Sequence, residues 1–87
     1  MGLMALQDDF TAAADRVKTL ASRPSNDDLL ALYALYKQGT DGDVSGSRPG
    51  MLDIKGRAKY DAWAKKKGTE KAAAQTQYIA LVERLSK

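Results

Sequence analysis

Apolar residues recur at steps of three and four along most of this chain, which is the spacing typical of amphipathic helices. The first such stretch runs from Leu6 to Leu20. The residue before a proline is disfavoured in helical geometry, so Pro24 should stop this helix, and we predict that it ends near Ala21. The pattern therefore predicts one amphipathic helix near the start of the chain.

A second helix is indicated by apolar positions from Leu29 to Tyr36 and by a capping signal in front of them. Ser25 opens "SNDD", in which Asp28 stands three residues on, as in a capping box. Two early aspartates also suit the positive end of the helix dipole. Glycine is common directly after a helix, so we expect this helix to stop at Gly39.

The remaining sequence predicts a long loop and two more helices. Residues 40–53 hold three glycines and a proline without helical periodicity. A loop of ~14 residues is long for a compact domain, and such loops tend to be functional. A short third helix fits Lys55–Lys67, with Gly68 as its C-cap and Thr69 as the N-cap of the next. The fourth helix fits Ala73–Leu85.

We therefore predict an all-α protein, a four-helix bundle with a long loop between the second and third helices. A long connection permits those two helices to run parallel, which a tight hairpin would not. The chain has 87 residues, enough for only one modest core, so we expect a single domain over residues 1–87.

Composition favours binding over catalysis. The chain has no histidine and no cysteine, so the commonest general base, the Ser-His and Cys-His nucleophile pairs and thiol chemistry are all missing. The longest apolar run, Leu29–Tyr36, is too short to span a bilayer. The opening "MGLMALQ" lacks a basic signal region, and Leu6 stands where a myristoylation motif needs Ser or Thr. We expect a soluble cytoplasmic protein that is not an enzyme and holds no metal.

Positive charge is concentrated in one segment. Residues 53–71 carry seven basic and three acidic residues, a local charge of +4 in a chain whose net charge is +3. On a helix, Lys55, Lys59 and Trp63 would form an i, i+4, i+8 stripe with Tyr60 beside it. Cations next to aromatic surface suit a ligand that combines phosphate with a flat ring or an apolar chain. A nucleic-acid patch or a solvated helix face has the same composition.

Two other patterns have ordinary structural explanations. In "DGDVSGSRPGML", Asp41, Asp43 and Ser45 have the spacing of a calcium loop. Leu52 stands where calcium needs a bidentate glutamate, so good turn residues are the better explanation. In "YALYKQ", residues 33–38, two tyrosines and a lysine are typical of a core rim with a snorkelling lysine.

Together these segments resemble the acyl-CoA-binding protein family, also called diazepam-binding inhibitor. That family typically reads Y-x-x-Y-K-Q-A-T-x-G-D and then R-P-G-M-x-D-x-x-G-K-A-K-W-x-A-W. This chain reads "YALYKQGTDGD" and then "RPGMLDIKGRAKYDAW". The similarity extends through "RPSNDDLLALY" and "KGTEKAAAQTQYIALV" and covers about residues 8 to 86 without gaps.

The resemblance implies an up-down-down-up bundle that carries long-chain acyl-CoA esters, with the acyl chain sheltered in a groove beneath the CoA head group. We expect no cofactor beyond this ligand, no nucleic-acid partner and transient contact with membranes or acyl-CoA-using enzymes. Nothing in the sequence demands oligomerisation, so we expect a monomer. The alternative that the residues leave open is a basic helical module that binds nucleic acid or protein.

The resemblance also implies site residues, matched motif by motif. Lys37 and Lys59 match the lysines that hold the ribose 3′-phosphate. Tyr33 matches a residue that meets the head group, Tyr36 its neighbour, and Tyr78 the tyrosine beside adenine and ribose. The remaining matches line the pocket and acyl groove or lie near them: Lys18, Phe10, Ala14, Leu29, Leu30, Lys55 and Arg57.

Three positions depart from the family pattern. Tyr60 stands where tryptophan is usual, which keeps an aromatic side chain with less ring area. Gly39 and Asp41 replace alanine and an apolar residue around the end of the second helix. Gly39 should loosen that end, and Asp41 brings a negative charge near the expected anion site. We expect affinity or chain-length preference to shift while the carrier role survives.

Overall fold

The structure, a computed structural model, describes residues 3–87. The expectation that the opening "MGLMALQ" is neither a signal sequence nor a myristoylation motif falls partly on Met1 and Gly2, which lie outside the described residues. Over residues 3–87 the chain forms four α-helices and no strand. The helices are α1 (Leu3–Val17), α2 (Asn26–Thr40), α3 (Ile54–Ala64) and α4 (Lys71–Leu85). No helix in this part of the chain is long and apolar enough to cross a membrane.

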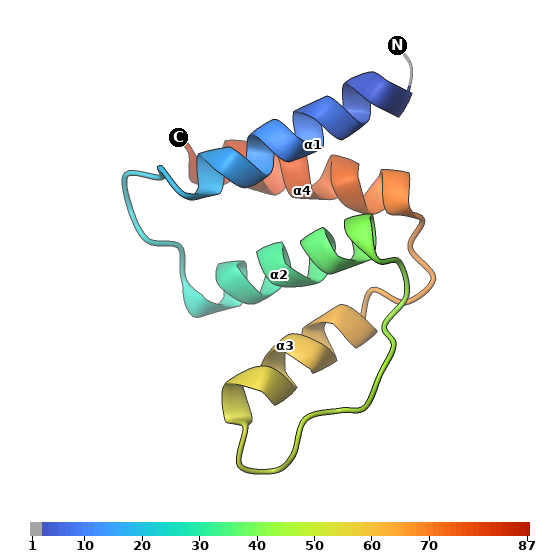
Figure 1. The fold of residues 1–87 in the computed structure, drawn as a ribbon. Coiled ribbons are helices and arrows are strands. Elements are labelled where there is room, and N and C mark those ends of the chain that lie inside the picture. Colours follow the sequence, from blue (N-terminus) through green and yellow to red (C-terminus); the bar gives the residue numbers. More distant parts are fainter. Residues whose placement is uncertain (1–2) are drawn as a thin grey trace.

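The helices are arranged as the sequence predicts. Figure 1 shows α1 and α4 running in one direction and α2 and α3 in the other, with the long loop joining α2 to α3. α4 packs against both α1 and α2, whereas α3 packs against α2. The prediction of an all-α, up-down-down-up four-helix bundle is therefore confirmed.

Two helices end earlier than predicted. α1 ends at Val17 instead of Ala21, because the next two N–H groups donate to carbonyls three residues back, at 3.2 and 3.0 Å, and tighten the chain into turns. α3 ends at Ala64, before the lysine run, and is followed by similar turns with bonds of 2.9 and 3.2 Å. Its C-cap is Lys65 and not Gly68, which lies further on with a φ of +91° that favours glycine.

The caps of α2 and α4 show which start signals are reliable. Ser25 caps α2 as predicted, and its hydroxyl accepts a hydrogen bond from the Asp28 N–H at 3.1 Å. The Asp28 carboxylate accepts from an arginine of α4 at 3.0 Å. The N-cap of α4 is Glu70 and not the predicted Thr69. The Thr69 carbonyl instead accepts from the Gln38 side chain at 2.7 Å, which ties this turn to α2.

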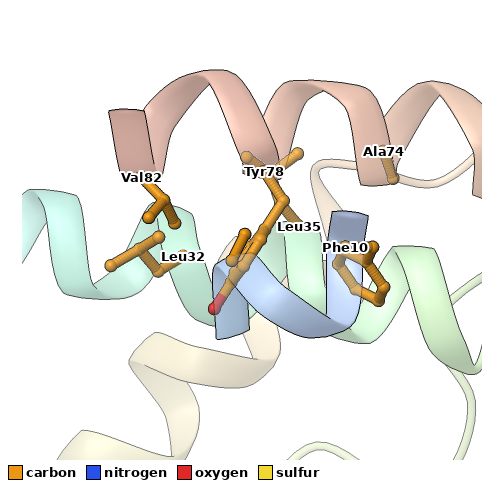
Figure 2. Packing of buried hydrophobic residues seen from close by; sticks show 7 residues of the cluster. Phe10, Leu32, Leu35, Ala74, Tyr78 and Val82 are labelled. Carbon is orange, nitrogen blue, oxygen red and sulfur yellow. The ribbon is translucent and has the colours of Figure 1, made fainter. Parts of the chain in front are cut away.

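The core lies where α4 meets α1 and α2. Figure 2 shows side chains from these three helices packed together. The buried apolar residues of this cluster are Phe10, Ala13, Leu32, Leu35, Ala74, Tyr78 and Val82. α3 adds only Trp63 to the buried apolar residues of the described chain, so the contact between α2 and α3 lies apart from this core.

Gly39 is packed tightly against the core. A Cβ at this position would lie 3.0 Å from Gln75 Cγ and 3.2 Å from Phe10 Cζ. The Gly39 carbonyl accepts a hydrogen bond from Gln75 Nε2 at 2.9 Å. We predicted that the helix would stop at Gly39, but α2 continues through this glycine to Thr40 without a break.

The long loop is held against α3 by side-chain hydrogen bonds. The donors and acceptors are Trp63 Nε1 to the Gly42 carbonyl (2.8 Å), Tyr60 Oη to the Gly46 carbonyl (3.0 Å), Arg57 Nε to the Pro49 carbonyl (2.9 Å), and Arg48 to both Asp61 oxygens (2.8 and 2.7 Å). Much of the "RPGMLDIKGRAKYDAW" segment therefore fixes the loop and, through it, the position of α3.

The carboxylates of the calcium-like sequence are engaged within the protein. Asp43 Oδ1 accepts from the Gly68 N–H and from Gln38 Nε2, both at 2.9 Å. Both hydrogen bonds lower the pKa of Asp43, and the bond from the Gly68 N–H has the larger effect on it. Asp41 pairs with Lys37. Among the described residues, no group of three or more Asp, Glu, His or Cys side chains could hold a metal ion.

Candidate functional site

α2 presents one continuous face on which five of the expected site residues lie. At about 100° per residue, Leu29, Leu30, Tyr33, Tyr36 and Lys37 fall within an arc of about 120°. Tyr36 lies at one edge of this arc and Leu30 at the other. Tyr36 lines one hollow, and Leu29 and Leu30, near the start of α2, line another, so this helix face connects two separate hollows.

The first hollow, the tyrosine cavity, lies between α1, α2 and α4 and has a volume of about 320 Å³. Its lining residues are Gln7, Phe10, Thr11, Ala14, Asp15, Lys18, Tyr36, Thr40 and Tyr78. The rings of Phe10, Tyr36 and Tyr78 contact one another, with centroids 5.1 to 6.0 Å apart. Lys18 is exposed directly after the end of α1 and contributes a cation. An aromatic wall beside a cation suits a flat polar ring that carries negative charge.

Tyr78 belongs to both the core and this cavity. Its side chain is 4% exposed, and Phe10 beside it is 2% exposed. Burial, and after it the neighbouring Tyr36, raises the pKa of the Tyr78 hydroxyl. Tyr78 therefore stays protonated at neutral pH, and its hydroxyl can donate a hydrogen bond.

The second hollow, the α2–α3 groove, has a volume of about 550 Å³. Its lining residues are Arg23, Asn26, Leu29, Leu30, Ile54, Lys55, Ala58 and Lys59. The apolar members come from facing helices, and three of the polar members are cations. An apolar groove edged by positive charge suits an extended hydrocarbon chain attached to an anionic group.

Two lysine–aromatic contacts join α2 and α3. Lys59 Nζ lies 5.4 Å from the ring centroid of Tyr33, and Lys37 Nζ lies 4.9 Å from that of Trp63. Each helix thus supplies one lysine and one ring, four residues apart. Both pairs form together because α2 and α3 run parallel, as Figure 1 shows. We call these four residues the lysine clamp, in which the lysine and the ring of each helix are one helical turn apart.

Lys37 has a second partner within its own helix. Its ammonium is paired with the Asp41 carboxylate one turn further along. Their hydrogen bond raises the pKa of Lys37 and lowers the pKa of Asp41, so both side chains are charged at neutral pH. The two side chains are 30% and 51% exposed. A ligand phosphate that approaches Lys37 from solvent therefore also approaches a carboxylate.

The expected residues fall into three neighbouring groups. The tyrosine cavity includes Phe10, Ala14, Lys18, Tyr36 and Tyr78, the α2–α3 groove includes Leu29, Leu30, Lys55 and Lys59, and the lysine clamp adds Tyr33 and Lys37. Eleven of the twelve thus border a hollow or belong to the clamp, and Arg57 does neither.

The stripe predicted along α3 is only partly exposed to a ligand. Lys55 and Lys59 line the groove, but Trp63 is 7% exposed and lines neither hollow. Its indole instead packs under Lys37 and donates to the loop. Tyr60 and Arg57 also bond to the loop, so their main contacts are structural.

Sequence reasoning missed four residues of the groove: Arg23, Asn26, Ile54 and Ala58. Ile54 and Ala58 each directly precede a lysine that was predicted, and they share one helix face at i and i+4. That spacing could have identified them. Arg23 and Asn26 flank the start of α2, and only the three-dimensional arrangement brings them to the groove.

Comparison with known proteins gives a consistent result. The family model for acyl-CoA-binding protein matches residues 7–82. Acyl-CoA-binding protein homolog 1 of Caenorhabditis elegans is 59% identical over 76 residues, which cover 87% of this chain and 88% of that protein. The acyl-CoA-binding protein homolog of Manduca sexta is 55% identical over 83 residues, covering 94% and 92%.

A solved structure agrees with the sequence matches. The crystal structure of Oryza sativa acyl-CoA-binding protein 2 superposes with a TM-score of 0.90 at 45% identity, covering 94% of this chain and 89% of that one. The chain therefore belongs to the acyl-CoA-binding protein family, and the resemblance noted in the sequence is confirmed. The alternative of a nucleic-acid-binding module gains no support from these relatives.

Proposed function

We propose that this protein is a carrier that binds long-chain acyl-CoA esters and releases them without reaction. The observation that carries the proposal is the lysine clamp, whose Tyr33 and Lys37 lie on the α2 face that joins an aromatic cavity to an apolar groove. An acyl-CoA has the same order of parts, because a nucleotide with its phosphates is linked to a hydrocarbon chain. Membership of the family supports this proposal.

The phosphates of the CoA head group are assigned to lysines. Lys37 and Lys59 hold the ribose 3′-phosphate, and Lys18 provides a further cation at the tyrosine cavity. Charge-assisted hydrogen bonds of this kind contribute about 1.5–3 kcal/mol each. Because these ammonium donors lie directly after α1, on α2 and on α3, the head group would connect three helices.

The rings of the head group are assigned to the tyrosines. Adenine and ribose lie against Tyr78 and Tyr36, where Phe10 and Ala14 complete the apolar wall. Tyr33 meets the head group next to Lys59, since the two side chains are already in contact. Aromatic faces stack on the base, while tyrosine hydroxyls bond to ribose or phosphate oxygens.

The acyl chain is assigned to the α2–α3 groove. Leu29 and Leu30 of α2 face Ile54 and Ala58 of α3 there, with Lys55 at the edge. Each buried methylene contributes about 0.8 kcal/mol, so every two carbons added to the chain strengthen binding by about tenfold while the groove lasts. Free CoA should bind weakly, and free fatty acid more weakly still.

The wider role follows from the same proposal. One domain, residues 1–87, acts as a monomer in the cytoplasm, and acyl-CoA is its ligand and not a cofactor. We expect the carrier to have no enzymatic activity, since histidine and cysteine, common groups for activating water or attacking a thioester, are both missing. Transient contact with membranes or with acyl-CoA-using enzymes would load and unload it.

Calorimetric titration with palmitoyl-CoA, CoA and palmitate tests the proposal. We expect one palmitoyl-CoA per chain, with affinity far above that for CoA and with palmitate the weakest of the three. Palmitate that bound as tightly as palmitoyl-CoA would show that the lysines and tyrosines do not recognise a head group. Hydrolysis of the thioester during an overnight incubation would contradict the carrier role.

A further inference from the structure

Asp41 places a negative charge at the lysine clamp that the proposed function does not use. Its carboxylate is paired with Lys37, and Lys71 at the start of α4 also lowers its pKa. Asp41 is the C-cap of α2, and its N–H donates to the Lys37 carbonyl at 2.8 Å. The backbone of Asp41 is thus fixed one turn from Lys37, which keeps its carboxylate near the ammonium.

A phosphate that binds Lys37 meets this carboxylate. An ammonium has three donors, so Lys37 can hold both anions at once, but the anions then lie within about 5 Å of each other. At water-like dielectric, a carboxylate and a phosphate dianion at that separation repel by an amount equal to about a tenfold change in affinity. If Asp41 instead releases Lys37, the ion pair is lost. Either course weakens phosphate binding.

We propose that Asp41 is a specificity-determining residue that weakens recognition of the 3′-phosphate by competing for Lys37. The inference rests on the proposed function, since it assumes that Lys37 binds this phosphate. Asp41 lies about 16 Å along α2 from Leu30, so its effect reaches the head group and not the acyl groove. The protein therefore distinguishes phosphorylated from dephosphorylated head groups less sharply than a clamp without this carboxylate.

The experiment compares wild type with Asp41→Asn, which keeps the side-chain shape and removes the charge. Each protein is titrated calorimetrically with palmitoyl-CoA and with its 3′-dephospho form. The matched control is Asp27→Asn, the same change at an exposed position of α2, about 20 Å from Asp41 along the helix. That separation exceeds the Debye length of about 8 Å, so the control charge is screened from the clamp.

Asp41→Asn should bind palmitoyl-CoA about tenfold more tightly than wild type and the 3′-dephospho ester within about twofold of it. Asp27→Asn should match wild type with both ligands. Unchanged or weaker binding of palmitoyl-CoA by Asp41→Asn would overturn the proposal, because Asp41 would then orient Lys37 instead of competing for it. Equal tightening of both ligands would overturn it as well, since the effect would not be specific to the 3′-phosphate. Wild type that bound neither ligand would overturn the proposed function along with this inference.

Discussion

The α2–α3 groove should set how much of an acyl chain the protein buries, and Ala58→Leu tests this directly. Ala58 lines the groove opposite Leu29 and Leu30, in a volume of about 550 Å³. Leucine adds three carbons to that space and displaces about three methylenes of the ligand. At about 0.8 kcal/mol per methylene, the loss is about 2.4 kcal/mol, so palmitoyl-CoA should bind about fiftyfold more weakly.

Calorimetry with palmitoyl-CoA and CoA provides the assay, and thermal unfolding verifies that the variant is folded. CoA should bind Ala58→Leu within about twofold of wild type, because it has no acyl chain for the added leucine carbons to displace. The matched control is Ala12→Leu, the same substitution at an exposed position of α1. Unchanged affinity for palmitoyl-CoA, or an equal loss for CoA, would refute the assignment of the acyl chain to this groove.

Three further changes have defined outcomes. Lys59→Ala should weaken palmitoyl-CoA binding by about 10- to 100-fold in calorimetry, and adding Tyr33→Phe should weaken it further. In Asp61→Asn, the free energy of unfolding measured with urea should fall less steeply as the pH is lowered into the acid range. The hydrogen bond from Arg48 lowers the pKa of folded Asp61, so the ionised carboxylate stabilises the fold above about pH 4, and this is lost as pH falls through the folded pKa. Val82→Ala empties a fully buried site and should lower the free energy of unfolding by about 2 kcal/mol in the same measurement.

Each of these three predictions has its own control or contradicting result. Lys65→Ala, at the exposed end of α3, is the control for Lys59, and equal losses in the two variants would point to general charge instead of a specific contact. An acid profile of Asp61→Asn identical to that of wild type would show that the ion pair does not favour the folded state. A Val82→Ala protein as stable as wild type would contradict the placement of this side chain in the core.

Local signals predicted the fold well where they act within a few residues. The predicted start of α2 is correct, because the Ser25 side chain accepts a hydrogen bond from an N–H three residues away and so caps the helix. The predicted end of α1 is wrong. Pro24 sets only an outer limit for the helix, and hydrogen bonds of the turn type end it earlier, at Val17. Thr69 was a plausible cap, but its carbonyl is bonded to Gln38, a contact between segments far apart in sequence.

The sequence named many of the residues that border the two hollows, but it did not name all of them or predict their arrangement. Helical spacing places Lys59 and Trp63 on one face of α3, yet it cannot say which of them faces solvent. The structure shows that Trp63 faces the loop and Lys37, because the parallel packing of α2 and α3 pairs each lysine with a ring of the other helix. The ion pair of Asp41 was foreseeable as an i, i+4 contact, but its place beside the clamp depends on that same packing.

In the proposed complex, one acyl-CoA lies across α2, with its head at the clamp and tyrosine cavity and its chain in the α2–α3 groove. The most direct test is an NMR titration of the labelled protein with an acyl-CoA that carries a nitroxide at the end of its chain. The amide signals of Leu30 and Ala58 should broaden most strongly at one equivalent, while those of Ala14 and Tyr78 should broaden less. Strongest broadening at Ala14 and Tyr78 would contradict the placement of the acyl chain in the α2–α3 groove.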